Sequence, residues 1–371
     1  MSKEYTCLGL MSGTSGDGVD ASIIISDGID KFTTMQEKYF EYDEKLFRKF
    51  HDLKKKINSL NDLKKLSHPL KDLENEITMF HAKVIQDISV GVNLDLIGFH
   101  GQTIYHNPQE KISLQLGNGS LLSQLSKKKI VYNFRKNDII NGGEGAPLTP
   151  IFHKYLIKSK KINLPACILN IGGISNITLI PNLDNTKILS KDVGPGNCLI
   201  NTWVQTHTNK KFDLDGQIAN RGKINEVILE QALETHENNF QKKNNNSFDT
   251  SDFDISFARG LNLEDGAATL TAFSANIISS KINFLLKEYE KNEIKIIVCG
   301  GGRKNKILLS HIKDNLNKNI SFYSAEDFEL NGDFIESQAF AYIAIRSILS
   351  LPISFPSTTG CASPCSGGEI I

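Results

Sequence analysis

The chain has 371 residues, of which 40% are apolar and 23% charged, and 42 Lys and Arg residues balance 42 Asp and Glu residues. This length allows two domains with sizeable cores, and the composition is ordinary for a globular protein. Zero net charge gives no reason to expect general binding to nucleic acid or to an anionic membrane. No apolar run approaches the ~20 residues of a membrane span, and the polar start is unlike a secretory signal. We therefore expect a cytoplasmic protein.

The first half of the chain predicts strands, then helices, then short strands that end in polar segments. Apolar residues recur at helical spacing after Pro69, which suits a helix start. In chain order we expect strands over residues 5–40, helices over 43–90, a strand at 94–98, a loop at 99–103, a strand at 130–133 and a helix over 148–159.

The second half continues the alternation of strands and helices. We expect a turn over 192–197 that leads into a helix from about 198, a mobile surface loop over 238–255, a helix over 263–291, a strand at 294–298, helices at 304–316 and 336–350, and an irregular tail. This alternation indicates the α/β class. No linker rich in Pro, Gly or Ser separates the halves, so we expect tightly packed domains with a cleft.

One kind of segment occurs twice. Residues 6–25 and 168–180 each consist of an apolar run, a small polar turn rich in glycine, and a second apolar run. This pattern predicts a hairpin whose turn can approach a ligand closely and hold an anion with backbone N–H groups. A third glycine cluster, residues 299–302, follows a buried-strand pattern. These turns predict two related domains that grip one polyphosphate.

The first glycine turn also carries oxygen ligands. Thr14 and Ser15 can donate to phosphate oxygens, and Asp17 and Asp20 can hold Mg²⁺ directly or through water. A plain hairpin turn with polar caps is the alternative. The segment is not a Walker loop, because that motif needs a lysine opening a helix.

Two further segments offer polar side chains. His100 and Gln102 could contact a substrate hydroxyl, and His100 with His106 is a weaker candidate for a metal pair. Arg135, at the end of a strand, could form a fork on a carboxylate or phosphate, or only a surface ion pair. Cys361 and Cys365 are close together, but no nearby Cys or His pair completes a zinc pattern.

Two carboxylates lie beside predicted helix starts. Asp192 precedes a Gly-Pro-Gly-Asn turn and could act on a reacting water, whereas helix capping there suits Asn197 better. Glu336 opens a helix, where the helix dipole alone would favour an acid. Asp192 and Glu336 are candidate partners for two-carboxylate sugar chemistry, although their separation cannot be read from the sequence.

Taken in order, these segments closely resemble the anhydro-N-acetylmuramic acid kinase family over roughly residues 7–360. Each block alone is common, and the specificity lies in their order along the chain. The blocks are 11–20 (MSGTSGDGVD), 100–104 (HGQTI), 134–135 (FR), 142–148 (GGEGAPL), 170–176 (NIGGISN), 194–197 (GPGN) and 299–302 (CGGG).

The resemblance implies the two-domain sugar kinase/Hsp70/actin-like, ribonuclease H-like fold, with ATP, Mg²⁺ and 1,6-anhydro-N-acetylmuramic acid in an interdomain cleft. It implies domains at residues 1–147 plus 337–371 and 148–336, and the products N-acetylmuramate 6-phosphate and ADP, with one water consumed. It implies a base at Asp192, a second carboxylate at Glu336 and a substrate-binding arginine at Arg135. The resemblance also implies sugar binding by His100, Gln102 and Asn197, and metal binding by Asp17 and Asp20. The residues that it implies for nucleotide binding come from the three glycine turns. They are Gly13, Thr14, Ser15, Gly16, Asp17, Gly18, Val19, Asp20, Gly172, Gly173, Asn176, Gly300, Gly301 and Gly302.

The chain departs from the family pattern at three positions. Gly16 replaces a usual Leu or Met, which predicts a more mobile loop, Val193 replaces a usual Thr, and Glu144 replaces a usual Gln. Two other functions stay open: a different sugar kinase of the same fold, and an actin-like nucleotide switch. The polar segments at 100–106 and 133–138 argue against a pure switch. A homodimer is a candidate assembly that the sequence does not test.

Overall fold

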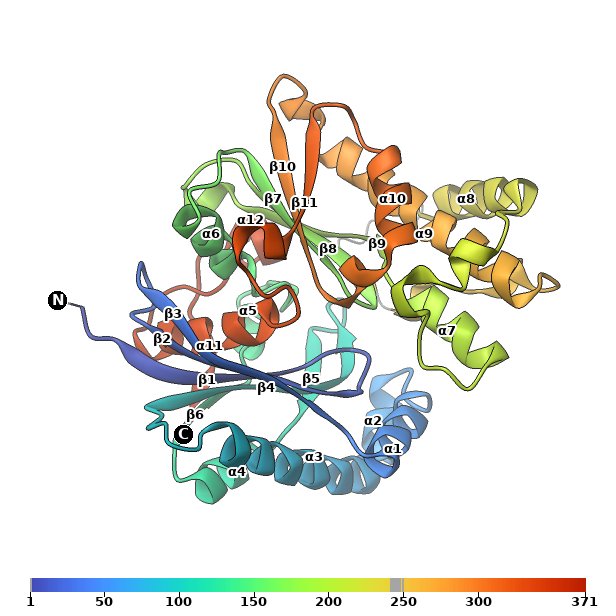
Figure 1. Ribbon diagram of the computed structural model, residues 1–371. Coiled ribbons are helices and arrows are strands. Elements are labelled where there is room, and N and C mark those ends of the chain that lie inside the picture. The colour runs from blue at the N-terminus through green and yellow to red at the C-terminus, as the bar shows by residue number, and fades with distance from the viewer. Residues whose placement is uncertain (1, 241–247, 249) are drawn as a thin grey trace. The chain divides into compact units, whose positions relative to one another are not determined.

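The computed structural model describes residues 2–240, 248 and 250–371, and the chain divides into two compact units (Figure 1). The first unit comprises residues 1–161, 183–188 and 334–371, and the second comprises 162–182 and 189–333. The expected first domain ends at 147, whereas the first unit also includes helix α6 (Pro150–Ser159). The ring of Phe152 on this helix lies 5.2 Å from that of Phe32 and 5.3 Å from that of Tyr342, both in the first unit.

The sheet of the first unit has the order β12-β6-β4-β1-β2-β3, and β5 pairs with β4. Strands β1, β2 and β3 pair antiparallel, whereas β1, β4 and β6 pair parallel. The bounds are β1 Tyr5–Ser12, β2 Gly18–Ser26, β3 Phe32–Glu41, β4 Leu96–Asn107, β5 Ile112–Leu116, β6 Lys129–Tyr132 and β12 Glu369–Ile370.

The second unit repeats this topology with the order β11-β10-β7-β8-β9. Its strands β7, β8 and β9 pair antiparallel, and β7, β10 and β11 pair parallel. The bounds are β7 Ala166–Ile171, β8 Ile174–Ile180, β9 Leu189–Pro195, β10 Ile294–Cys299 and β11 Ile320–Ser324. Each unit therefore begins with an antiparallel meander and adds two parallel strands. This repeat confirms the predicted α/β class and the ribonuclease H-like architecture of two related units.

Helices on both faces bury the sheet of the first unit. On one face, α1 (Glu44–Lys54), α3 (Ser67–Ile88) and α4 (Gly119–Ser126) pack against the sheet around a core that includes Leu8, Ile23, Phe50 and Ile77. The predicted helical spacing after Pro69 is confirmed, because the apolar positions of α3 point into this core. Shorter helices are α2 (Leu60–Lys65), α5 (Lys136–Ile140) and α12 (Pro356–Thr359).

The other face carries α11 (Ile335–Ile348), which follows the last residue of the second unit. Two glycines allow this helix to approach the sheet backbone. A Cβ at Gly9 of β1 would lie 1.9 Å from the Ser337 carbonyl oxygen, and one at Gly98 of β4 would lie 2.3 Å from the Phe340 carbonyl oxygen. Larger residues there would push the helix off the sheet, so both glycines set the position of Glu336.

In the second unit, α9 (Leu263–Leu285) and α10 (Lys306–Asp314) cover one face of the sheet. A second apolar cluster forms where α9 meets α7 (Cys198–His207) and α8 (Glu226–Phe240), and Trp203 lies buried within it. Figure 1 shows these three helices side by side.

Three sequence-based expectations are wrong. Residues 99–103 are part of β4 and not a loop, because this stretch extends past the predicted strand and pairs with β5. Residues 192–195 end strand β9 instead of forming a turn, because they pair with β8. The tail is not wholly irregular, since α12 forms and β12 joins the sheet beside β6. Of the expected loop at 238–255, residues 241–247 and 249 lie outside the described residues.

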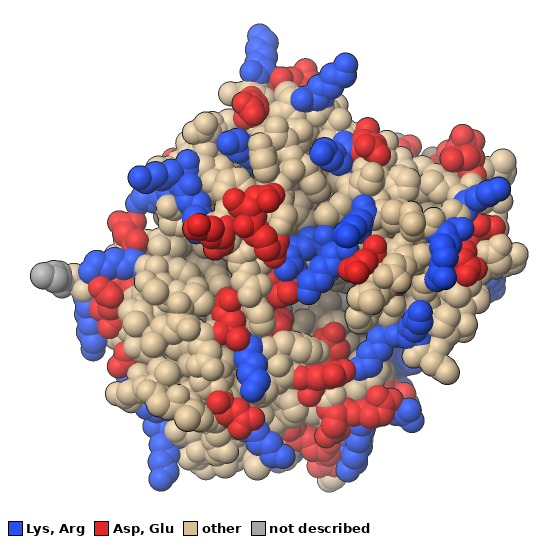
Figure 2. All heavy atoms as spheres, in the orientation of Figure 1, with Lys and Arg blue, Asp and Glu red and all other residues tan. Residues whose placement is uncertain are grey.

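On the face drawn in Figure 2, Lys and Arg side chains are interspersed with Asp and Glu. No helix among the described residues is both long enough and apolar enough to span a membrane.

Candidate functional site

The first glycine turn joins β1 to β2 as predicted. Its backbone closes through the Gly16 N–H, which donates to the Gly13 carbonyl oxygen at 3.1 Å. Gly16 has φ +61°, and a Cβ there would lie 2.2 Å from the ring of Phe50. Gly13 is different, because an added Cβ would meet only the Ser15 hydroxyl at 3.6 Å. Phe50 therefore leaves no space for a side chain at residue 16, whereas Gly13 leaves room for a ligand.

A buried polar chain supports this turn from below. Gln102 is 0% exposed and donates from Nε2 to the Gly13 carbonyl oxygen at 2.7 Å. Tyr42 donates to Gln102 Oε1 at 3.4 Å, and Ser12 Oγ lies 3.1 Å from the Tyr42 hydroxyl and 3.3 Å from His81 Nε2. The structure therefore places Gln102, an expected sugar ligand, beneath the first glycine turn.

Sequence reasoning missed His81, although a signal was present. His81 lies four residues after Ile77 on the apolar face of α3, and its Nδ1 lies 2.8 Å from the Ile77 carbonyl oxygen. Burial lowers the pKa of His81 to about 4, so the ring is neutral near pH 7. With Nδ1 donating to Ile77, Nε2 accepts from Ser12.

The two expected metal ligands differ in their surroundings. Asp17 lies in the turn, half-buried, and its Oδ1 accepts a hydrogen bond from the exposed Ser15 hydroxyl at 2.7 Å. Asp20 lies on β2 opposite Met11 of β1 and is also half-buried. Both offer carboxylate oxygens, which are the ligands that Mg²⁺ prefers.

Arg135 and His100 lie together in the first unit. Arg135 donates from one terminal nitrogen to His100 Nε2 and from the other to the Gly145 carbonyl oxygen, each at 2.9 Å. Because His100 Nε2 accepts, Nδ1 carries the proton and donates to the Gly101 carbonyl oxygen at 2.8 Å. Burial and the charge of Arg135 hold the pKa of His100 well below its ordinary value. His106, the other half of the weaker metal pair, has Nδ1 2.9 Å from the Ser113 hydroxyl.

Glu336, in the first turn of α11, lies near enough to Arg135 for their charges to interact. Burial raises the pKa of its carboxyl, and the charge of Arg135 opposes that shift. Burial likewise lowers the pKa of Arg135 to about 10, and its buried Nε has no hydrogen-bond partner among the residues that the structure describes. The Ser22 and Ser337 hydroxyls lie 2.6 Å apart and fix the start of the helix. One group of side chains thus contains Arg135, neutral His100 and Glu336. Its unused hydrogen-bond donor is Arg135 Nε.

The second glycine turn, in the other unit, joins β7 to β8 as predicted. Gly172 has open space, since an added Cβ would meet only the Ile174 carbonyl oxygen at 3.5 Å. The Asn197 N–H donates to the Gly172 carbonyl oxygen at 2.8 Å. Asn197 occupies the N-cap position of α7, as expected, but its side chain makes no capping hydrogen bond to the helix.

Strand pairing aligns four polar positions across the second sheet. Cys299 lies opposite Asn170, Asn170 opposite Asn176, and Asn176 opposite Asp192. Residues paired across strands project to the same face, so the expected base Asp192 and the expected ligand Asn176 are neighbours. Asp192 accepts from the Phe248 N–H at 2.7 Å. Asn170 belongs to this row although it was not among the predicted site residues, and an apolar run ending in Asn just before Gly-Gly was the available signal.

The third glycine cluster follows β10, and its contacts are with other residues of the second unit. Gly300 has φ +78° and donates to the Gly332 carbonyl oxygen at 2.9 Å. A Cβ at Gly302 would lie 2.1 Å from Ile171, whereas one at Gly301 would meet nothing within 4 Å. Gly301 alone therefore leaves its backbone open.

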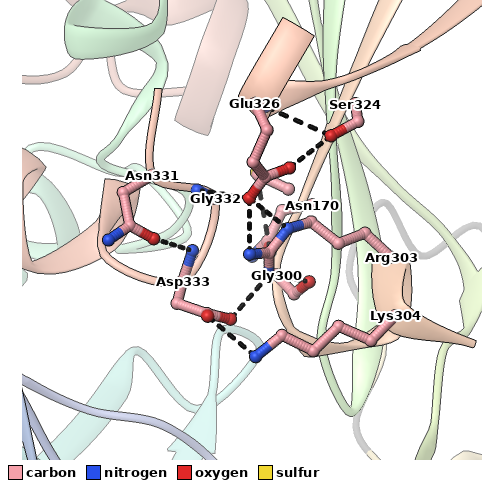
Figure 3. Close-up of polar contacts among 10 residues, drawn as sticks. Asn170, Gly300, Arg303, Lys304, Ser324, Glu326, Asn331, Gly332 and Asp333 are labelled. Atoms are coloured by element: carbon pink, nitrogen blue, oxygen red, sulfur yellow. Dashed lines mark hydrogen bonds and ion pairs between the residues drawn. The ribbon is translucent and has the colours of Figure 1, made fainter. Parts of the chain in front are cut away.

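An ion-pair network surrounds this cluster (Figure 3). Arg303 donates to Glu326 Oε1 and Asp333 Oδ1, each at 2.6 Å, and to the Gly300 carbonyl oxygen at 3.0 Å. Lys304 donates to the other Asp333 oxygen at 2.8 Å. Burial alone would raise the pKa of Glu326, but hydrogen bonds from Arg303 and Ser324 lower it to about 2. No pattern in the sequence predicts this network, because its acids lie 23 and 30 residues from Arg303.

Two sequence comparisons identify the family that this chain matches. Residues 5–371 match the model of the anhydro-N-acetylmuramic acid kinase family. The anhydro-N-acetylmuramic acid kinase of Pelagibacter ubique is 53% identical, with 100% of this chain and 99% of that protein aligned. The enzyme of that name from Zymomonas mobilis is 35% identical, with 98% of each chain aligned.

Among solved structures, a ROK family glucokinase from Streptomyces griseus in complex with glucose and AMPPNP is 11% identical, with a TM-score of 0.43 and coverage of 92% of this chain and 99% of that one. The sequence matches agree with the first functional expectation and not with the two alternatives. On the evidence of matches that span its whole length, this chain is a kinase and belongs to the anhydro-N-acetylmuramic acid kinase family.

Proposed function

We propose that the enzyme opens 1,6-anhydro-N-acetylmuramic acid with water and phosphorylates O6 with ATP, giving N-acetylmuramate 6-phosphate and ADP. The full-length family match supports this reaction. The observation in the structure that carries the sugar assignment is the group of Arg135, His100 and Glu336. It combines an unused buried Arg135 nitrogen with a carboxyl whose pKa is raised by burial, which suits a ligand bearing both a carboxylate and hydroxyl groups.

For the nucleotide, each glycine turn has one residue whose backbone is open to a ligand. Gly13, Gly172 and Gly301 have space beside the backbone, whereas Gly16 and Gly302 are tight against the protein's own side chains. We assign phosphate binding to N–H groups of the open glycines, with the tight glycines holding the turns in shape.

Asp17 and Asp20 fit a Mg²⁺ ion by donor chemistry, because both present half-buried carboxylates beside the Gly13 turn. Bound there, the ion would neutralise charge on the transferring phosphoryl group. In this role Ser15 holds the Asp17 carboxylate through its hydroxyl.

Asp192 is the proposed general base. It takes a proton from the water that attacks the anomeric carbon; the bond from that carbon to the bridging oxygen breaks, and the oxygen released is O6. This oxygen attacks the γ-phosphorus of ATP, and ADP leaves. Because ring opening generates the nucleophile, no second base is needed at O6.

Arg135 and Glu336 act on the sugar itself. Arg135 binds the lactyl carboxylate through its unused nitrogen while its other donors hold His100 and Gly145. Glu336, with its raised pKa, lies at the start of α11 and interacts with a sugar hydroxyl or the anhydro bridge. The side-chain amide of Asn197, which makes no capping hydrogen bond, is free to bind the sugar. Gln102 contributes to the site indirectly, because it supports the turn at Gly13.

A mass-spectrometric product assay in ¹⁸O-water tests the reaction. With the anhydro sugar and ATP, we expect one ¹⁸O atom at the anomeric oxygen and unlabelled phosphate at O6. Label in the phosphate, or phosphorylation of plain N-acetylmuramate without water consumption, would contradict the proposal and favour another sugar kinase activity. ATP turnover that does not depend on sugar would favour a nucleotide switch.

A further inference from the structure

Outside the residues assigned above, three buried side chains of metal-ligand type meet in the first unit. Asp138 lies on α5, and Cys361 and Cys365 lie in the segment between α12 and β12. An oxygen of the carboxylate and the two Sγ atoms all lie within 4.8 Å of one another. Their exposed fractions are 1%, 1% and 8%. We call these three residues the Asp–Cys cluster.

One edge of the cluster has a length close to that expected in a tetrahedral metal site. Cys365 Sγ lies 3.8 Å from Asp138 Oδ1. Zinc bonds of about 2.3 Å to sulfur and 2.1 Å to oxygen give a tetrahedral edge of about 3.6 Å between the two ligand atoms. The spacing of Cys361 and Cys365 lies within the two to four intervening residues usual for zinc cysteines. The Ser354 hydroxyl, 3.0 Å from Cys365 Sγ, marks where an oxygen or a water could complete the site.

The charges also favour a divalent ion. Two thiolates and one carboxylate carry three negative charges, and a divalent cation reduces the total to one, beside the Arg135 guanidinium, whose charge interacts with Asp138 as well as with Glu336. Cysteine binds zinc as a thiolate, so metal binding to a thiol releases a proton.

From these observations we propose that Asp138, Cys361 and Cys365 bind a thiophilic divalent cation, with zinc as the best match. The sequence alone did not reveal this site because the third ligand lies 223 positions before Cys361 and reaches it only through the fold.

The site is linked to the proposed sugar-binding arginine through hydrogen bonds. Asp138 Oδ2 accepts from the Gly145 N–H at 2.7 Å, and the Gly145 carbonyl oxygen accepts from Arg135 at 2.9 Å. Thr359 donates to Asp138 Oδ1 at 2.6 Å and its carbonyl oxygen accepts from the Glu144 N–H at 2.8 Å. A cation that fixes the carboxylate would also fix the loop at 142–145, and we expect it to raise the unfolding temperature.

Cobalt(II) tests the site directly in the full-length chain. After removal of metal with a chelator, titration with Co²⁺ should produce thiolate-to-cobalt charge-transfer absorption at one equivalent, and Zn²⁺ should abolish it. The absorption should disappear in Cys361→Ala and Cys365→Ala. The matched control is Cys167→Ala, which removes a buried thiol from the core of the second unit and should leave the absorption unchanged.

A second measurement needs no variant. X-ray absorption at the zinc edge of the wild-type protein should show two sulfur neighbours at about 2.3 Å. Absence of the cobalt absorption in wild type, its survival in a folded cluster variant, or a zinc shell of nitrogen and oxygen only would each overturn the proposal. If the variants fail to fold, the zinc spectrum of the wild type decides.

Discussion

Arg303 is bonded to Asp333, with one terminal nitrogen 2.6 Å from the carboxylate oxygen Oδ1. Arg303 directly follows the glycine cluster after β10, and Asp333 is the last residue of the second unit before the chain enters α11. The same side chain also binds the Gly300 carbonyl oxygen and Glu326. One arginine therefore ties a turn proposed to bind phosphate to the segment that leads to Glu336.

We expect Arg303→Ala to weaken ATP binding, although Arg303 itself is not proposed to contact the nucleotide. Loss of the bonds to Gly300 and to two acids should raise the KM for ATP more than the KM for the sugar, and lower the free energy of unfolding by roughly 1–3 kcal/mol. Steady-state kinetics and chemical denaturation measure these effects. Arg303→Lys should restore part of the ATP affinity, and the control Lys304→Ala should change little, because the Lys304 side chain is exposed. An unchanged KM for ATP in a folded Arg303→Ala would limit Arg303 to stability.

The lowered pKa of Glu326 predicts that the fold loses stability in acid. Its folded pKa, about 2, lies below its ordinary value of 4.5. A depressed carboxyl pKa stabilises the fold above the unfolded pKa, and this contribution is lost as the pH falls from about 4.5 to 2. Denaturation midpoints should show Glu326→Gln less stable than wild type at pH 7 and nearly equal to it near pH 2. A difference that does not depend on pH would show that the ion pair is not its source.

Two substitutions in the first glycine turn should separate binding from folding. Gly13→Val should leave the protein folded, because an added Cβ has space, but should weaken calorimetric ATP binding. Gly16→Ala should destabilise the fold by roughly 1–3 kcal/mol, because its Cβ would overlap Phe50 and the backbone has positive φ. Unchanged ATP affinity in folded Gly13→Val would remove the turn from the nucleotide site.

Arg135→Lys tests the arginine fork. Lysine keeps the charge but cannot bind His100, Gly145 and a ligand at once. We expect a higher KM for the sugar with a smaller change for ATP, measured by steady-state kinetics. If both KM values equal those of the wild type, Arg135 has only a structural role.

Asp192→Asn tests the general base. The amide keeps the size of the side chain and can still accept from the Phe248 N–H, but it cannot take the proton of the attacking water. The expected loss in kcat is about 10²–10⁴-fold, and sugar and ATP affinities should change little, because the role is confined to the transition state. Near wild-type kcat in the folded variant would exclude this role and make Glu336 the next residue to test.

The sequence by itself determined the local elements and the order of the motifs. The glycine hairpins, the helical spacing in α3 and the alternation of strands and helices depend on residues close in the chain, so their patterns predict them. The family match depends on the same linear order.

The tertiary structure decided which distant residues meet. The Gln102 side chain lies beneath Gly13, and residues 99–103 belong to β4. Arg303 forms ion pairs with Glu326 and Asp333, and Asp138 lies beside Cys361 and Cys365. Each of these contacts joins segments that only sheet pairing and helix packing bring together. No pattern within a short window encodes them, because hydrogen bonds and ion pairs depend on distances in space and not on separation along the chain.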